Sequence, residues 1–192
     1  MNRIFKQSIL LAIVISLVSM GLISCIKKEQ KEKEKTLKVG MSYQGGFIAY
    51  IDETGEHGLI AAPYDQSEGI EWGKLENDSS YIVTGATGTL IGTGRSNTTK
   101  IVQAQGVGNY AAKLCDDLVL NGYSDWFLPS KDELKELYEK SNSIGGFNFS
   151  KKYWSSSEAD GDDGTWSAWC RSYSQYTEDK NNTYRVRAVR NF

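Results

Sequence analysis

Short stretches of alternating or mostly apolar residues recur along the chain, and each one predicts a strand. The predicted strands cover residues 47–51, 58–62, 153–157, 166–173 and 184–190. The polar residues 52–56 lie between the first two and predict a hairpin turn. In the last stretch Tyr184, Val186 and Ala188 alternate with arginines, so we expect one face of this strand to be apolar.

Apolar residues at helical spacing predict helices between these strands. One helix passes through residues 101–102, with Asn97 as its expected cap. Another covers residues 110–118, with Asn109 as its expected cap. Residues 64–80 are polar and are expected to be irregular. Helices and several hairpins together predict a mixed α+β domain.

The clearest helix start lies within residues 122–134, which read Gly-Tyr-Ser-Asp-Trp-Phe-Leu-Pro-Ser-Lys-Asp-Glu-Leu. Pro129 disfavours helix at the residue before it, so the helix begins after the proline. Ser130 and Glu133 have the spacing of a capping box, in which each side chain satisfies a backbone amide of the other residue. Apolar residues follow at helical spacing and predict a buried helix face.

An uncharged and mostly apolar run at residues 8–24 follows the basic Arg3 and Lys6. The run is shorter than the roughly 20 residues that a bilayer-spanning helix needs, so residues 1–24 predict a signal peptide. It ends in Leu-Ile-Ser-Cys, which resembles the bacterial lipobox and implies attachment of diacylglycerol to Cys25. Several acyl chains would then hold the protein stably at a membrane. The alternative is an ordinary signal peptide that a cysteine follows by chance.

Lysines and glutamates dominate residues 26–35, and a segment this charged cannot bury enough apolar surface to fold. Residues 25–35 therefore predict a lipidated tether, and residues 36–192 are long enough for one domain. The whole chain has a formal charge of −2, and its first 35 residues carry +4, so the domain carries about −6. That charge argues against nucleic acid as a partner.

Few residues could carry catalysis or hold a cofactor. His57 is the only histidine, and nothing around it marks a nucleophile, so we expect a solvated turn residue and no enzyme. The carboxylates of residues 160–163 lack an EF-hand pattern, and we expect neither a metal nor a cofactor. Cys115 and Cys170 can form a disulfide in an envelope compartment. The sequence leaves open whether their Cα atoms come close enough.

The motif at residues 122–134 also carries a family resemblance. Further matching segments read Tyr-Trp-Ser-Ser-Ser-Glu at 153–158, Ala-Trp at 168–169 and Val-Arg-Ala-Val-Arg at 186–190. Together they resemble the domain-of-unknown-function 1566 family, which is also called the Lcl C-terminal domain family. The resemblance implies a C-type-lectin-like fold, with two helices packed on small antiparallel sheets and long loops between them. From residue 153 onward the chain is also similar to the variable proteins of diversity-generating retroelements, which present interchangeable residues on such a scaffold.

Polar and aromatic residues in the last third of the chain predict a binding surface, because tyrosine and tryptophan offer large, rigid contact areas. The expected ligand-binding residues are Asp160, Asp162, Trp166, Arg171, Tyr173, Tyr176 and Tyr184. Trp154 and Trp169 are expected in the core instead. We therefore expect a lipoprotein anchored in the bacterial envelope, at the outer membrane, that binds a glycan or protein as an adhesin or receptor. The sequence leaves open whether the domain faces the exterior or the periplasm. The alternative is an assembly lipoprotein whose domain docks onto another envelope protein.

Overall fold

The structure, a computed structural model, describes residues 36–73, 75–77, 80–148, 150–159, 164–169 and 174–192. The chain divides into two units, Met1–Thr36 and Leu37–Phe192, and every helix and strand named below belongs to the second unit. The predicted signal peptide and tether lie outside the described residues. Within the described ranges, no helix has the length and apolar character needed to cross a bilayer.

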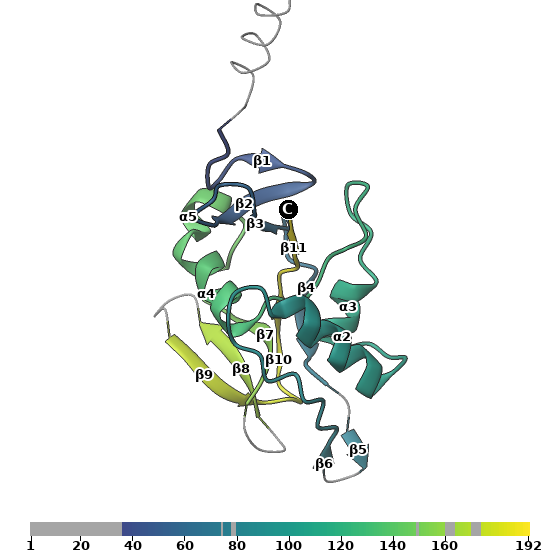
Figure 1. Cartoon of the computed structure of the whole chain (residues 1–192). Helices are drawn as coiled ribbons and strands as arrows, with labels where there is room; N and C mark the ends of the chain where they lie inside the picture. The colour runs from purple at the N-terminus through teal and green to yellow at the C-terminus, as the bar shows by residue number, and fades with distance from the viewer. Residues whose placement is uncertain (1–35, 74, 78–79, 149, 160–163, 170–173) are drawn as a thin grey trace, which may run out of the picture. The chain divides into compact units, whose positions relative to one another are not determined.

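The second unit has the expected α+β architecture (Figure 1). Its helices are α2 (Gly94–Gln105), α3 (Ala111–Asp116), α4 (Lys131–Glu139) and α5 (Ser141–Ile144). Its strands are β1 (Ser42–Tyr43), β2 (Gly46–Ile51), β3 (Gly58–Ala61), β4 (Ser67–Glu71), β5 (Leu75–Asn77), β6 (Ser80–Tyr81), β7 (Lys152–Glu158), β8 (Gly164–Trp169), β9 (Ser174–Asp179), β10 (Thr183–Val186) and β11 (Val189–Asn191). Short helices with small antiparallel and mixed sheets are consistent with a C-type-lectin-like fold.

Four strands form one sheet in the order β1-β2-β3-β11, so the first and last strands of the unit share a sheet (Figure 1). All neighbouring strands in it are antiparallel, and β2 and β3 form the expected hairpin. Gly58 permits their close approach, because a Cβ added there would lie 2.0 Å from the carbonyl oxygen of Tyr50. A larger residue would therefore force these two strands apart.

Five strands form a second sheet in the order β4-β10-β7-β8-β9, with β9 at one edge. The β10 and β7 strands are parallel, with Arg185 opposite Tyr153, and the other pairs are antiparallel. A two-stranded sheet of β5 and β6 lies apart from it. The expectation that residues 64–80 are irregular is therefore wrong. The short polar strand β4 pairs with β10, which is more than a hundred residues away, and no local pattern reveals that partner.

The single strand predicted over residues 184–190 is also wrong, because the chain leaves one sheet after β10 and enters the other at β11. Arg187 lies at this break and is fully buried. Its guanidinium donates to Asp65 Oδ1 at 2.8 Å, to the carbonyl of Ala62 at 3.1 Å and to the carbonyl of Gly146. A buried charge is tolerated where a counter-charge and hydrogen bonds satisfy it, as they do here.

Helix α4 begins as predicted. The Ser130 hydroxyl accepts a hydrogen bond from the Glu133 amide at 3.3 Å, and Glu133 Oε2 accepts one from the Ser130 amide at 2.7 Å. The capping box is therefore confirmed. Glu133 Oε1 also accepts from the amide of Gly92 at 2.8 Å, which ties the loop before α2 to the start of α4. Burial raises the pKa of Glu133, although these amides oppose the shift.

The expected helix caps at Asn97 and Asn109 are wrong. Helix α2 begins earlier, with Thr93 at its N-cap, and Asn97 lies buried within the helix. The Asn97 side chain instead donates to the carbonyl of Gly88 at 2.6 Å and accepts from its amide at 3.2 Å. Helix α3 has Tyr110 at its N-cap. Asn97 therefore fixes the neighbouring loop at Gly88 and does not cap the helix.

Two clusters of buried side chains form the core, one around Trp72 and Trp154 and the other around Leu137 and Tyr153. Trp154 is fully buried, as expected, and its indole nitrogen donates to the carbonyl of Ile70 at 2.8 Å. Helix α2 packs on β7, and α4 packs on both β2 and β7. Helix α4 thus connects the two larger sheets. The side chain of Trp169 lies outside the described residues.

Candidate functional site

The structure describes only part of the predicted ligand-binding set. Outside the described residues lie Asp160, Asp162, Arg171 and Tyr173, together with the side chain of Trp166. Tyr176 and Tyr184 are described, in β9 and β10 respectively. The structure brings these two tyrosines to the same lysine, although β9 and β10 are not adjacent in the sheet.

Tyr176 presents its ring to solvent, with 43% of the residue exposed. Lys152, at the start of β7, places its Nζ 5.7 Å from the centroid of the Tyr176 ring and 5.2 Å from that of the Tyr184 ring. An ammonium group within about 6 Å of an aromatic centroid is attracted to the ring. One lysine therefore helps to hold both tyrosine rings in place.

Glu178 completes this group, which we call the β9 cluster: Lys152, Tyr176, Glu178 and Tyr184. Glu178 forms an ion pair with Lys152 and accepts a hydrogen bond from the Tyr184 hydroxyl at 2.7 Å. The Tyr184 ring also packs on Trp154, with their centroids 4.5 Å apart. Burial, and then the contact with Glu178, raise the pKa of Tyr184, so its phenol stays protonated at neutral pH. The cluster offers an aromatic surface whose neighbouring charges are already paired.

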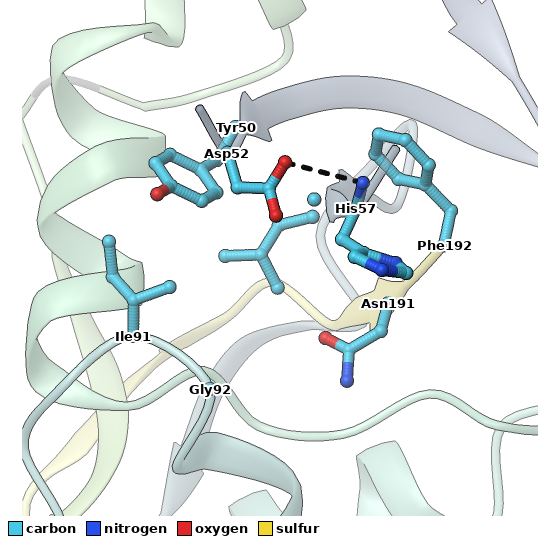
Figure 2. A pocket seen from close by; sticks show the side chains of 9 residues that line it. Tyr50, Asp52, His57, Ile91, Gly92, Asn191 and Phe192 are labelled. Atoms are coloured by element: carbon cyan, nitrogen blue, oxygen red, sulfur yellow. Dashed lines mark hydrogen bonds between the residues drawn. The ribbon is translucent and has the colours of Figure 1, made fainter. Parts of the chain in front are cut away.

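A pocket of about 350 Å³ opens at the turn of the β2–β3 hairpin (Figure 2). We call it the hairpin pocket, and its lining residues are Tyr50, Asp52, His57, Gly58, Leu59, Ile91, Gly92, Asn191 and Phe192. They come from the hairpin, from the loop before α2, and from the last residue of β11 together with Phe192, which follows it. The sequence interpretation missed this pocket. It expected His57 at an exposed turn, where His57 does lie. It could not reveal the pocket, because the pairing of β3 with β11 leaves no signal in the local sequence.

A profile of the Lcl C-terminal domain family matches residues 62–190. The chain belongs to the Lcl C-terminal domain family. The match covers the whole five-stranded sheet and helices α2 to α5. Strands β1 to β3 precede it, although they share a sheet with β11 at its end. A search of curated proteins finds no similar protein.

Among the residues that the structure describes, no three His, Cys, Asp or Glu side chains gather in a way that could hold a metal ion. The carboxylate loop at residues 160–163 lies outside that part of the chain. Cys115 is fully buried, and burial raises the pKa of its thiol. Cys170 lies outside the described residues, so the disulfide stays a prediction.

Proposed function

We propose that this Lcl C-terminal domain protein is an envelope-anchored lipoprotein whose lectin-like module binds an extracellular glycan or protein, as an adhesin or receptor, and does not catalyse a reaction. The observation that carries the proposal is the β9 cluster, in which an exposed tyrosine ring is steadied by a paired lysine. Binding energy at interfaces concentrates in a few residues such as tyrosine, tryptophan and arginine. A ring that its neighbours already restrain loses little conformational entropy when a ligand packs on it.

The membrane anchor in this proposal rests on the first 35 residues. Cys25 follows an apolar signal-peptide run and would carry the lipid. Residues 26–35 would then form the tether. An extended chain spans at most about 3.3–3.6 Å per residue, so this tether can hold the domain roughly 30 Å from the membrane surface. That distance would leave the β9 cluster accessible to a partner outside the membrane.

The test compares the parent protein with the variant Tyr176→Ala and with the double variant Arg171→Ala, Tyr176→Ala, which also removes the arginine predicted from sequence. We expect either variant to lose binding on a glycan array or to host cells. Its free energy of unfolding should stay within about 1 kcal/mol of the parent value, because Tyr176 is exposed. The matched control is Thr177→Ala, which changes the next exposed residue of β9 and should bind normally.

Two outcomes would count against this proposal. Full binding by a stable double variant would place the ligand site elsewhere. A single stoichiometric envelope protein recovered in a pull-down, without glycan or host-cell binding by the parent, would favour the alternative role in envelope assembly.

A further inference from the structure

The hairpin pocket holds a carboxylate whose two oxygens have different surroundings. Asp52 Oδ1 accepts hydrogen bonds from the amides of Thr54 and Gly55 at 3.1 and 3.0 Å, and from the Thr54 hydroxyl at 2.6 Å. The amide nitrogen of His57 lies 3.5 Å from Oδ1, at the upper limit of hydrogen-bond distance. These bonds fix the carboxylate to the hairpin turn. No described residue donates to Oδ2, and Figure 2 shows that oxygen turned into the pocket.

The charge around this carboxylate favours a cation. The hydrogen bond from the Thr54 side chain holds the pKa of Asp52 below its usual value, so the group is charged at neutral pH. Glu53 and Glu56 add two further carboxylates on the same turn. None of the lining residues is lysine or arginine, and His57 is the only one that can become positive. An anionic ligand would therefore meet repulsion here, whereas a cation would be attracted.

The rest of the pocket is largely apolar, and a β-bulge contributes to its shape. The apolar walls are the side chains of Tyr50, Leu59, Ile91 and Phe192. Ile48 lies opposite Ile60, but the next pair joins Tyr50 to Leu59, so β2 carries one extra residue at this point. Asn191 lies opposite Leu59 on the other side. Since cross-strand partners project from the same face of a sheet, Tyr50, Leu59 and Asn191 form a row across three strands.

We propose that the hairpin pocket binds an alkyl ammonium group. The ammonium donates to Asp52 Oδ2, and its methylene chain packs between the Tyr50 ring and Ile91. The tyrosine ring adds a cation–π attraction, and the Asn191 amide offers a further acceptor. A few placed polar groups in an apolar pocket are typical of small-ligand sites. The same chemistry is carried by the lysine side chain of a protein and by a free diamine. The proposal is independent of the β9 cluster.

The test is an NMR titration of the isotope-labelled full-length protein in mild detergent. One probe is cadaverine, and the matched probe is the diol of the same chain length, which carries no charge. We expect cadaverine, and not the diol, to shift the amide signals of the hairpin turn and of Gly92. A second probe, lysine with blocked backbone ends, separates the two sources. Tighter binding of blocked lysine would indicate a protein partner, and tighter binding of cadaverine a free diamine.

Asp52→Asn is the decisive variant. Asparagine keeps an oxygen at the position of Oδ1, where it can still cap the turn, and replaces Oδ2 by a donor. Cadaverine should then bind roughly tenfold more weakly or worse, since a charge-assisted hydrogen bond is lost. The control Glu53→Gln also removes one negative charge from the turn, but Glu53 does not line the pocket. It should change cadaverine binding less than about twofold.

Ile91→Ala supplies a second variant that leaves the turn intact, so the proposal can be tested even if Asp52→Asn does not fold. It should weaken cadaverine binding a few-fold through lost apolar contact. Tyr176→Ala should leave cadaverine binding unchanged, which separates this proposal from the one on the β9 cluster. Equal shifts with the diol, unchanged binding by both pocket variants, or an equal loss in Glu53→Gln would overturn the assignment.

Discussion

Replacing Glu158 with glutamine should strongly destabilise the domain, because it leaves a buried lysine without its counter-charge. The side chains of Glu158 and Lys180 are only 2% and 1% exposed, and Lys180 Nζ lies 2.6 Å from Glu158 Oε1. Glu158 Oε2 accepts hydrogen bonds from the amides of Thr84 and Gly85 at 3.0 and 2.8 Å. One carboxylate therefore joins the end of β7, the residue after β9 and the loop that leads towards α2.

The expected cost follows from the burial of the pair. Removing one partner of a buried ion pair usually costs about 3–5 kcal/mol, because the remaining charge stays in a poorly solvated site. Glutamine keeps one acceptor, but its amide group faces donors from Lys180 or Thr84. Part of the lysine charge stays compensated, since Nζ also donates to the carbonyl of Ile82 at 3.2 Å and lies 5.1 Å from the Trp72 ring centroid. We therefore expect a loss near the lower limit, about 3 kcal/mol.

Urea unfolding followed by tryptophan fluorescence measures this loss, and Trp72 lies close enough to report on it. Lys180→Met should cost a similar amount. The double variant should cost less than the sum of the two single changes, because no unpaired buried charge remains. Lys135→Met removes an exposed lysine and should stay within about 0.5 kcal/mol of the parent. A cost below about 1 kcal/mol for Glu158→Gln, or two single costs that simply add, would contradict a coupled buried ion pair.

The same pair predicts how stability depends on pH. Burial raises the pKa of Glu158, but hydrogen bonds from Lys180 and Thr84 outweigh it, and the pKa lies below its usual value. A carboxyl group with a lowered pKa in the folded state stabilises the protein above its unfolded pKa, and this contribution is lost as the pH falls through the folded pKa. Lowering the pH from roughly 5 to 3 should therefore reduce the stability of the parent more than that of Glu158→Gln. Equal acid dependence would contradict the assignment.

Three further predictions address the cap, the anchor and the metal. Ser130→Ala should lower the free energy of unfolding by about 1 kcal/mol through loss of the confirmed cap, and an unchanged urea midpoint would argue against that role. Cys25→Ala should release the protein from membranes or leave it unprocessed, whereas unchanged mass and membrane fractionation would contradict lipidation. A chelator should leave the melting temperature unchanged. A fall of several degrees that calcium reverses would point to a metal at residues 160–163.

Local signals in the sequence were enough for part of the fold. The capping box of Ser130 and Glu133 depends on residues three apart, so the sequence alone places the start of α4. The hairpin around residues 52–56 is equally local, because its two strands are neighbours along the chain. The burial of Trp154 follows from its size and apolar character.

The parts that could not be predicted depend on partners distant in sequence. Alternation places Arg187 on the face opposite the apolar one, and its burial depends on Asp65 and on the carbonyls of Ala62 and Gly146, which no local pattern reveals. Asn97 is a residue type that often caps helices, but its side chain donates to the carbonyl of Gly88 and, at 3.4 Å, to the hydroxyl of the distant Ser156. The hairpin pocket needs β11 beside β3, a pairing that brings residues about 130 positions apart into one row. Two of the predicted ligand-binding residues, Tyr176 and Tyr184, have side chains that the structure describes, and both approach Lys152.

Buried carboxylates explain how this domain orders loops that have little structure of their own. Segments rich in glycine and threonine have a high conformational entropy, so they need bonds from outside the loop to stay fixed. Glu158 binds the amide of Gly85 at 2.8 Å, and Glu133 binds that of Gly92 at the same distance. Glu158 is the last residue of β7 and Glu133 lies in the first turn of α4, and both elements pack in the core. Gly92 also lines the hairpin pocket, so one wall of that pocket is held from the start of α4 and not by its own sequence.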